Sequence, residues 1–174
     1  VFDTLNAKAA LMGIEEYLQS ANIRIPVMVS GTITDASGRT LSGQTLEAFM
    51  LSLDHAELLS IGLNCSLGAK EIRPYLKEMS GKSSHFTSVH PNAGLPNQFG
   101  EYDETPKEMS QLIGDFIQSG FVNIVGGCCG TTPEHIQAFA ELTKKGVVRV
   151  PAEQKAGLKL SGLEPLTAFE GSNF

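Results

Sequence analysis

The chain alternates between short apolar runs and amphipathic segments, and this alternation limits the folds open to it. Most apolar runs end in polar or glycine-rich residues and are followed by a helical pattern, at about 30 residues per unit. Such repetition is typical of parallel βαβ construction. The pattern predicts strands over residues 25–31, 58–64, 85–90 and 122–125, and helices over residues 7–21, 45–53, 69–80, 105–119 and 133–144.

The two ends of the chain depart from this pattern. Residues 1–6 read as the end of a strand already under way, and because the chain starts at Val1 rather than at methionine, we expect a fragment. Residues 1–146 form one α/β unit, either an open doubly wound sheet or about half of an eight-stranded barrel. After Val147 the periodicity vanishes, and prolines and glycines predict an extended exit segment over residues 147–174.

The composition narrows the possible partners and the compartment. A net charge of -6 without a basic block argues against a nucleic-acid surface, and no stretch has the apolar length that spans a bilayer. Three cysteines cannot all pair with one another. We therefore expect a cytoplasmic protein whose thiols stay reduced and available to a metal.

All three cysteines lie where a predicted strand ends. Cys128 and Cys129 follow the strand at residues 122–125 within Gly126-Gly127-Cys128-Cys129-Gly130, and Cys65 follows the strand at residues 58–64. Neighbouring side chains on a straight strand point to opposite faces, so the paired cysteines need a turn, which the glycines permit. Because the carboxyl ends of parallel strands share one rim, we expect the three thiols to converge there.

Three thiolates would fill three of the four tetrahedral positions of zinc and leave one open for a substrate. Two other interpretations remain open: the cysteines are simply packed in the core, or Cys128 and Cys129 form a redox-sensing vicinal disulfide. His90 could complete a Cys3His site, although a lone histidine is more often packed and hydrogen-bonded. The amide of Asn92 could contact a substrate or hold the open metal position, although asparagine is also common in turns.

The cysteine motifs resemble those of the homocysteine S-methyltransferase family. The resemblance rests on Gly126-Gly127-Cys128-Cys129-Gly130-Thr131 together with Gly62-Leu63-Asn64-Cys65. It extends along most of the chain and is closest to the branch of the family that uses cobalamin. The further matching segments are Val1-Phe2-Asp3-Thr4-Leu5-Asn6, Ser30-Gly31-Thr32-Ile33-Thr34-Asp35, His90-Pro91-Asn92-Ala93-Gly94-Leu95-Pro96 and Leu160-Ser161-Gly162-Leu163-Glu164-Pro165-Leu166.

The resemblance implies a fold, a cofactor and a reaction. Residues 1–146 would be the carboxyl-terminal half of a (β/α)8 barrel, and residues 147–174 would lead toward a downstream folate-binding module. Cys65, Cys128 and Cys129 would bind a catalytic zinc, with Asn92 beside the metal and the substrate homocysteine. The methyl donor would be methylcobalamin on another module, with betaine or S-methylmethionine as the alternative donors. The fragment alone is expected to be inactive, because the first half of the barrel carries much of the amino-acid pocket.

Overall fold

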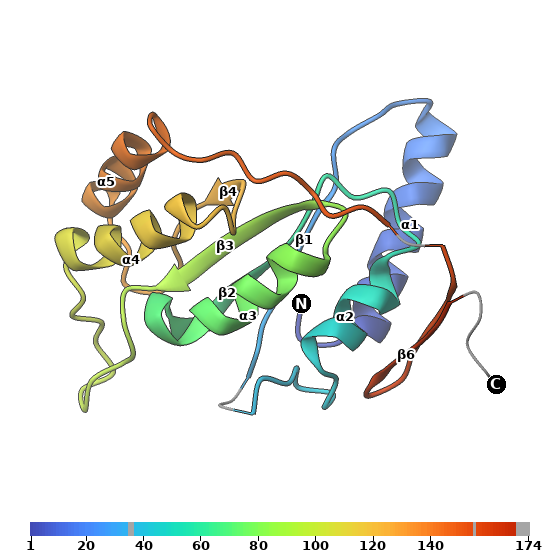
Figure 1. Cartoon of the computed structure of the whole chain (residues 1–174), viewed down its shortest axis with the longest axis horizontal. Helices are drawn as coiled ribbons and strands as arrows, with labels where there is room; N and C mark the ends of the chain where they lie inside the picture. Colours follow the sequence, from blue (N-terminus) through green and yellow to red (C-terminus); the bar gives the residue numbers. More distant parts are fainter. Residues whose placement is uncertain (35–36, 155, 170–174) are drawn as a thin grey trace.

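The computed structural model describes residues 1–34, 37–154 and 156–169, and at its centre lies a sheet of four parallel strands (Figure 1). The strands are β1 (Met28–Gly31), β2 (Ser60–Gly68), β3 (Phe86–Asn92) and β4 (Ile124–Val125), hydrogen-bonded in chain order. Their register aligns Ser30 with Gly62 and Gly62 with Ser88. All four carboxyl ends therefore lie along one edge of the sheet.

Five helices accompany the sheet, and each packs against the next one along the chain. They are α1 (Thr4–Ala21), α2 (Leu46–Leu53), α3 (Ala69–Lys82), α4 (Pro106–Gln118) and α5 (Pro133–Thr143). A doubly wound sheet would reverse its strand order at a switch point, and the sequential order here does not reverse. The chain thus has the predicted fold, half of a (β/α)8 barrel. No helix in the described part of the chain is long and apolar enough to cross a membrane.

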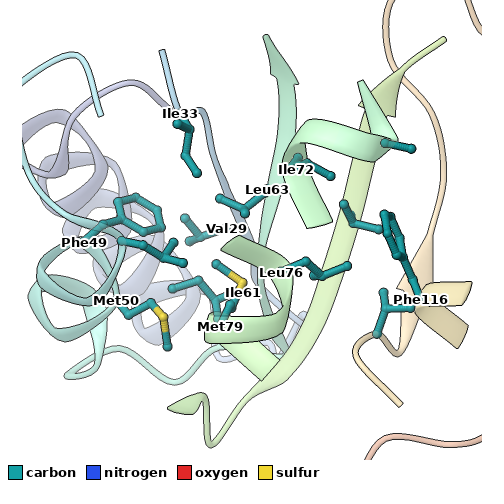
Figure 2. Close-up of a cluster of buried hydrophobic side chains, with 14 of the residues drawn as sticks. Val29, Ile33, Phe49, Met50, Ile61, Leu63, Ile72, Leu76, Met79 and Phe116 are labelled. Atoms are coloured by element: carbon teal, nitrogen blue, oxygen red, sulfur yellow. The ribbon is translucent and has the colours of Figure 1, made fainter. Parts of the chain in front are cut away.

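Apolar side chains between the sheet and the helices form the core. Val29, Ile61 and Leu63 of the strands meet Phe49 of α2 and Leu76 of α3 (Figure 2). Each of these five side chains is buried, so the outer face of the sheet and the inner faces of the helices exclude water together. This packing fixes the strand ends that carry the cysteines.

The helix starts follow their local sequence. Thr105 accepts a hydrogen bond from the Glu108 N–H, and the Glu108 carboxylate accepts one from the Thr105 N–H, which is the predicted capping box. At the other end of the chain, the prediction of a strand over residues 1–6 is wrong for residues 4–6. Asp3 caps α1 through a 2.9 Å bond from the Asn6 N–H, so the helix begins at Thr4.

Val1 nevertheless pairs with the sheet as a strand end would. Its amino group donates to the Ser30 carbonyl at 2.7 Å, and its carbonyl accepts from the Thr32 N–H at 3.0 Å. These two bonds straddle Gly31 in the pattern of a parallel ladder. The edge of β1 is therefore covered at its carboxyl end.

The exit segment contains regular structure that the sequence analysis did not predict. Strands β5 (Leu158–Ser161) and β6 (Pro165–Ala168) form an antiparallel hairpin. The hairpin lies on α2, where the Ser161 hydroxyl donates to the Ala48 carbonyl at 2.6 Å. The two strands have only four residues each, with Gly162 in the turn between them, and apolar periodicity over so few residues does not distinguish a strand from an irregular extended segment. Residues 155 and 170–174 of the predicted exit segment lie outside the described residues.

Arg149 anchors the first part of this segment to the sheet. Its guanidinium is buried and donates to the carbonyls of Ser80, Ser83 and His85 at 2.6 to 3.1 Å. From there the chain crosses to the α2 side of the molecule (Figure 1). The arginine thus supplies donors to carbonyls at and just beyond the end of α3, including the Ser80 carbonyl in its last turn.

Candidate metal centre

The three cysteines come together at the carboxyl edge of the sheet. The sulfur of Cys129 lies 3.6 Å from that of Cys65 and 4.0 Å from that of Cys128. All three sulfurs lie within 4.8 Å of one another, and the three residues are half-buried, free thiols. Among the described residues, this is the one group of three or more Cys, His, Asp or Glu side chains with donor atoms so close.

The sulfur triangle has the dimensions of three ligands of a tetrahedral zinc site. Zinc–sulfur bonds of about 2.3 Å at tetrahedral angles place neighbouring sulfurs about 3.8 Å apart. The two shorter separations, 3.6 and 4.0 Å, lie on either side of that value. The donor set also suits zinc, which binds thiolates and, in catalytic sites, keeps one position for water or substrate.

An unusual backbone turn presents Cys65 to the other two cysteines. Cys65 and Ser66 both have left-handed φ angles, 57° and 60°, and the register of β2 against β3 shifts between Asn64 and Gly68. The sequence analysis ended this strand at residue 64, whereas β2 continues irregularly to Gly68. The bulge redirects the Cys65 side chain toward the other two cysteines.

The turn that carries Cys128 and Cys129 is fastened to the end of β3. The Cys128 N–H donates to the Pro91 carbonyl at 2.8 Å, and the Cys129 carbonyl accepts from the Ala93 N–H at 2.9 Å. Gly130 then has a φ of 78°, the left-handed conformation that the sequence analysis expected the glycines to supply. The two backbone hydrogen bonds to the end of β3 and the left-handed conformation of Gly130 together define the turn that carries Cys128 and Cys129.

Asn92 lies between the two cysteine segments. It is 1% exposed, and its Oδ1 accepts a hydrogen bond from the Cys129 N–H at 3.1 Å. Its side chain is also among the polar groups that lower the pKa of the Cys65 thiol. Asn92 thus fixes the position of the cysteines, and its contact with a substrate stays a prediction.

His90 lies outside the sulfur group. Its ring packs on Gly126, where a Cβ atom would come within 2.4 Å of the ring Cδ2. Burial lowers the pKa of His90, so the imidazole is neutral at pH 7. The arrangement matches the packed histidine of the sequence analysis rather than a fourth ligand.

The thiols of the metal-free cluster differ in acidity. Burial, followed by the hydrogen bond and charge from Cys65, raises the pKa of Cys128 to about 11. Burial also opposes ionisation of Cys65, but the hydrogen bonds from Ser66, Cys128, Cys129 and Asn92 outweigh it and lower the pKa of Cys65. Cys65 is thus a preferred place for negative charge, and Cys128 holds its proton until a cation displaces it.

Two residues near the site have no counterpart in the sequence analysis. His135 is buried at the start of α5, where Nδ1 accepts from the Thr132 N–H at 3.1 Å and Nε2 donates to the Glu104 carbonyl at 2.9 Å. Tyr102, from the loop between β3 and α4, lies against Gly130. His135 occupies the capping-box position that Glu or Gln normally fills, so no local sequence signal marks either His135 or Tyr102.

Comparisons with known proteins identify a family and a similar fold. The family model for homocysteine S-methyltransferase matches residues 1–143. The structure is also similar to the apo crystal structure of the homocysteine methyltransferase MmuM from Escherichia coli, with a TM-score of 0.52 and 22% sequence identity. That match covers 76% of this chain and 45% of the other, so the chain spans less than half the length of the protein it resembles. At this identity the likeness is one of fold.

Proposed function

The chain belongs to the homocysteine S-methyltransferase family, and we propose that its three cysteines hold a catalytic zinc that activates homocysteine for S-methylation to methionine. The sulfur triangle of Cys65, Cys128 and Cys129 carries this proposal. Its size suits one tetrahedral ion, and it lies at the strand ends where barrels of this class perform chemistry.

The chemistry of the substrate explains why such a centre is useful. A thiol with a pKa of about 8.5 is mostly protonated at neutral pH and is then a poor nucleophile. Zinc, when bound, would stabilise the substrate thiolate, while three cysteine thiolates offset the charge of the ion and keep the substrate sulfur electron-rich. The substrate sulfur would then bond to the methyl carbon as the bond from carbon to the donor breaks.

The residues around the triangle have separate roles in this proposal. The left-handed turn at Cys65 and the glycine turn after Cys129 aim the sulfurs at one point. Asn92 accepts a hydrogen bond from the Cys129 N–H and lowers the pKa of the Cys65 thiol, and we propose that it also borders the substrate pocket. A reducing compartment such as the cytoplasm would keep all three thiols free.

We propose methylcobalamin as the methyl donor and cobalamin-dependent methionine synthase as the parent protein. The support is the resemblance of the exit-segment sequence around Leu160–Leu166 to that branch, in which cobalamin-binding and folate-binding modules belong to the same chain. Betaine and S-methylmethionine are the alternative donors. Assays of the parent protein with each donor in turn separate the three, because only the true donor yields methionine.

We further propose that this chain alone binds metal but does not turn over. All three proposed ligands lie within it, yet it spans only 45% of the E. coli methyltransferase structure that it matches. Residues that would complete an amino-acid pocket are expected in the remaining part of such a barrel.

Zinc content per chain tests the metal centre directly. Reduced wild-type protein should contain about one zinc, and Cys65→Ala and Cys128→Ala should each lose it, since both segments supply ligands to one ion. Ser66→Ala is a matched control, because it alters the neighbour of Cys65 but keeps the Ser66 N–H and all three sulfurs. Folded wild-type protein without zinc would contradict the proposal. Reversible oxidation of Cys128 and Cys129 without zinc uptake would favour the thiol sensor, which has no role for the nearby Cys65.

A further inference from the structure

The inner face of the sheet, opposite the helices, is polar near the carboxyl ends of β1 and β2. Val29, Ile61 and Leu63 belong to the core on the outer face. Because side chains alternate along a strand, Ser30 and Asn64 therefore lie on the inner face. Branched apolar side chains normally fill the interior of a (β/α)8 barrel. Polar residues in their place indicate that this level of the interior receives a ligand.

The residues around Asn64 on this face are also small or polar. The strand register places Asn64 opposite His90, and both are half-buried. The His90 ring packs on Gly126, which has no side chain to cover it. Below Asn64, the Ser88 hydroxyl oxygen lies 2.0 Å from where a Cβ atom of Gly62 would be, so a hydroxyl occupies that space. The inner face at this level therefore offers polar groups rather than an apolar layer.

Ser30 fixes the amide of Asn64. The Ser30 hydroxyl donates to the Asn64 Oδ1 at 2.6 Å, from β1 across to β2. The acceptor end of the amide is thus engaged, while Nδ2 retains two hydrogens to donate. Within the described part of the chain, the Asn64 side chain makes no second hydrogen bond. Its remaining capacity suits a hydrogen-bond acceptor, such as a carboxylate, rather than an ammonium group.

Asn64 also lies next to the metal centre. It directly precedes Cys65, whose sulfur is 3.6 Å from that of Cys129. Homocysteine carries its carboxylate on a short flexible chain beyond the sulfur. A substrate whose sulfur occupies the open metal position must therefore place its carboxylate close to the three cysteines, within the region that the Asn64 amide borders.

We propose that Asn64 is a specificity-determining residue whose Nδ2 donates to the carboxylate of homocysteine, and that Ser30 is a positioning residue that holds the amide in this orientation. The inference rests on the proposed function, because it needs the substrate sulfur to lie at the three cysteines. The pair selects thiols that carry a carboxylate, since a substrate without one leaves the buried side of the amide donor unpaired.

The test measures methylation by the parent protein and by variants of confirmed zinc content. Asn64→Asp keeps the shape of the side chain and the acceptor for Ser30, but it replaces the donor with a negatively charged acceptor. The KM for homocysteine should rise about 10-fold to 100-fold with kcat little changed, because ground state and transition state lose the same contact. The kcat/KM for 3-aminopropanethiol, which lacks only the carboxylate, should not fall.

Substitutions of Ser30 test the orientation of the amide without altering Asn64. Ser30→Ala removes the hydroxyl and should raise the KM for homocysteine about fivefold, again without a loss for 3-aminopropanethiol. Ser30→Thr keeps a hydroxyl and should restore the KM. Ser20→Ala, at an exposed position of α1, is the matched control and should behave as wild type with both thiols.

The outcomes separate this inference from the function on which it rests. A zinc-containing parent protein that methylates neither thiol would overturn the proposed function and this inference together. An active wild type whose Asn64→Asp variant keeps its KM for homocysteine, or loses both thiols equally, would overturn the role of Asn64 alone. If Asn64→Asp loses zinc, the Ser30 variants decide. An unchanged KM in zinc-loaded Ser30→Ala would then overturn the inference, and a raised KM that Ser30→Thr restores would support it.

Discussion

Replacement of Asn92 by alanine should loosen both cysteine segments at once. The side chain is 1% exposed, its Oδ1 accepts from the Cys129 N–H at 3.1 Å, and it is among the polar groups that lower the pKa of the Cys65 thiol. In the variant the Cys129 N–H loses its acceptor, and an unsatisfied buried donor costs about 1 to 3 kcal/mol. The Cys65 thiol loses a polar neighbour as well.

Both folding and metal binding should be weakened. Because about 1.4 kcal/mol corresponds to a tenfold change in an equilibrium constant, we expect a zinc affinity about 10-fold to 100-fold below wild type, together with a lower melting temperature. Competition against a chromophoric chelator measures the affinity on reduced protein. Gln19→Ala, which removes an exposed amide from α1, should change neither quantity.

The same measurement can refute the reasoning. If Asn92→Ala has the native circular dichroism spectrum and the zinc affinity of wild type, then Asn92 does not position the ligands, and the hydrogen bond to Cys129 is incidental. An effect confined to homocysteine binding in the parent protein would instead assign Asn92 to the substrate pocket alone.

Three further predictions follow from charges and buried contacts elsewhere in the chain. Burial, followed by the charges of Glu108 and Glu71, raises the pKa of Glu104 above its ordinary value of 4.5. Near this pH the folded state therefore binds more protons than the unfolded state, so the stability of the fold falls as the pH rises above 4.5 through the raised pKa. Glu104→Gln should therefore gain stability relative to wild type at pH 7 but not at pH 4, as measured by melting temperature, whereas Glu16→Gln on α1 should show no such difference. Arg149→Met removes the guanidinium that donates to the carbonyls of Ser80, Ser83 and His85, of which Ser83 keeps the Ala152 N–H and His85 keeps the Ser83 hydroxyl as donors. The variant should lower the free energy of unfolding in urea by about 1 to 3 kcal/mol, while the exposed Arg24→Met should have little effect. Because the pKa of Cys128 is raised to about 11, zinc binding at pH 7 should release at least the Cys128 proton, and the zinc affinity should therefore rise with pH. Calorimetry in buffers of different ionisation enthalpy counts the protons released. Zinc binding without proton release would contradict a thiolate site.

The sequence predicted the order of the elements well because apolar runs at the strands alternate regularly with amphipathic helical segments. The capping box at Thr105 and the cysteine turn at Gly130 were also predictable, since both depend on local chemistry. The sulfur triangle followed from one topological rule, that parallel strands share a carboxyl edge. Whether these sulfurs hold zinc stays a prediction.

Other features depend on contacts between distant residues and left no local signal. The left-handed pair at Cys65 and Ser66 was not predictable, because neither residue favours that conformation by itself. Tyr102 meets Gly130 only through the shape of the loop between β3 and α4. The start of α1 was missed because the cap at Asp3 lies within apolar residues that read as strand. The hairpin at β5 and β6 depends on its contact with α2.

Strand β4 has only two residues, and it is hydrogen-bonded to β3 alone. An ion shared by Cys65 and Cys128 would join β2 to the segment beyond β4, across β3, and close a loop of 63 residues (128 minus 65). A permanent cross-link of that span would raise the free energy of the unfolded chain by about 4 kcal/mol, because it removes conformational entropy from that state. The metal would then act as a reversible cross-link that holds the two-residue strand β4 to the rest of the sheet. Chelation should speed amide hydrogen exchange in β4 first, well before it affects the buried centre of β2.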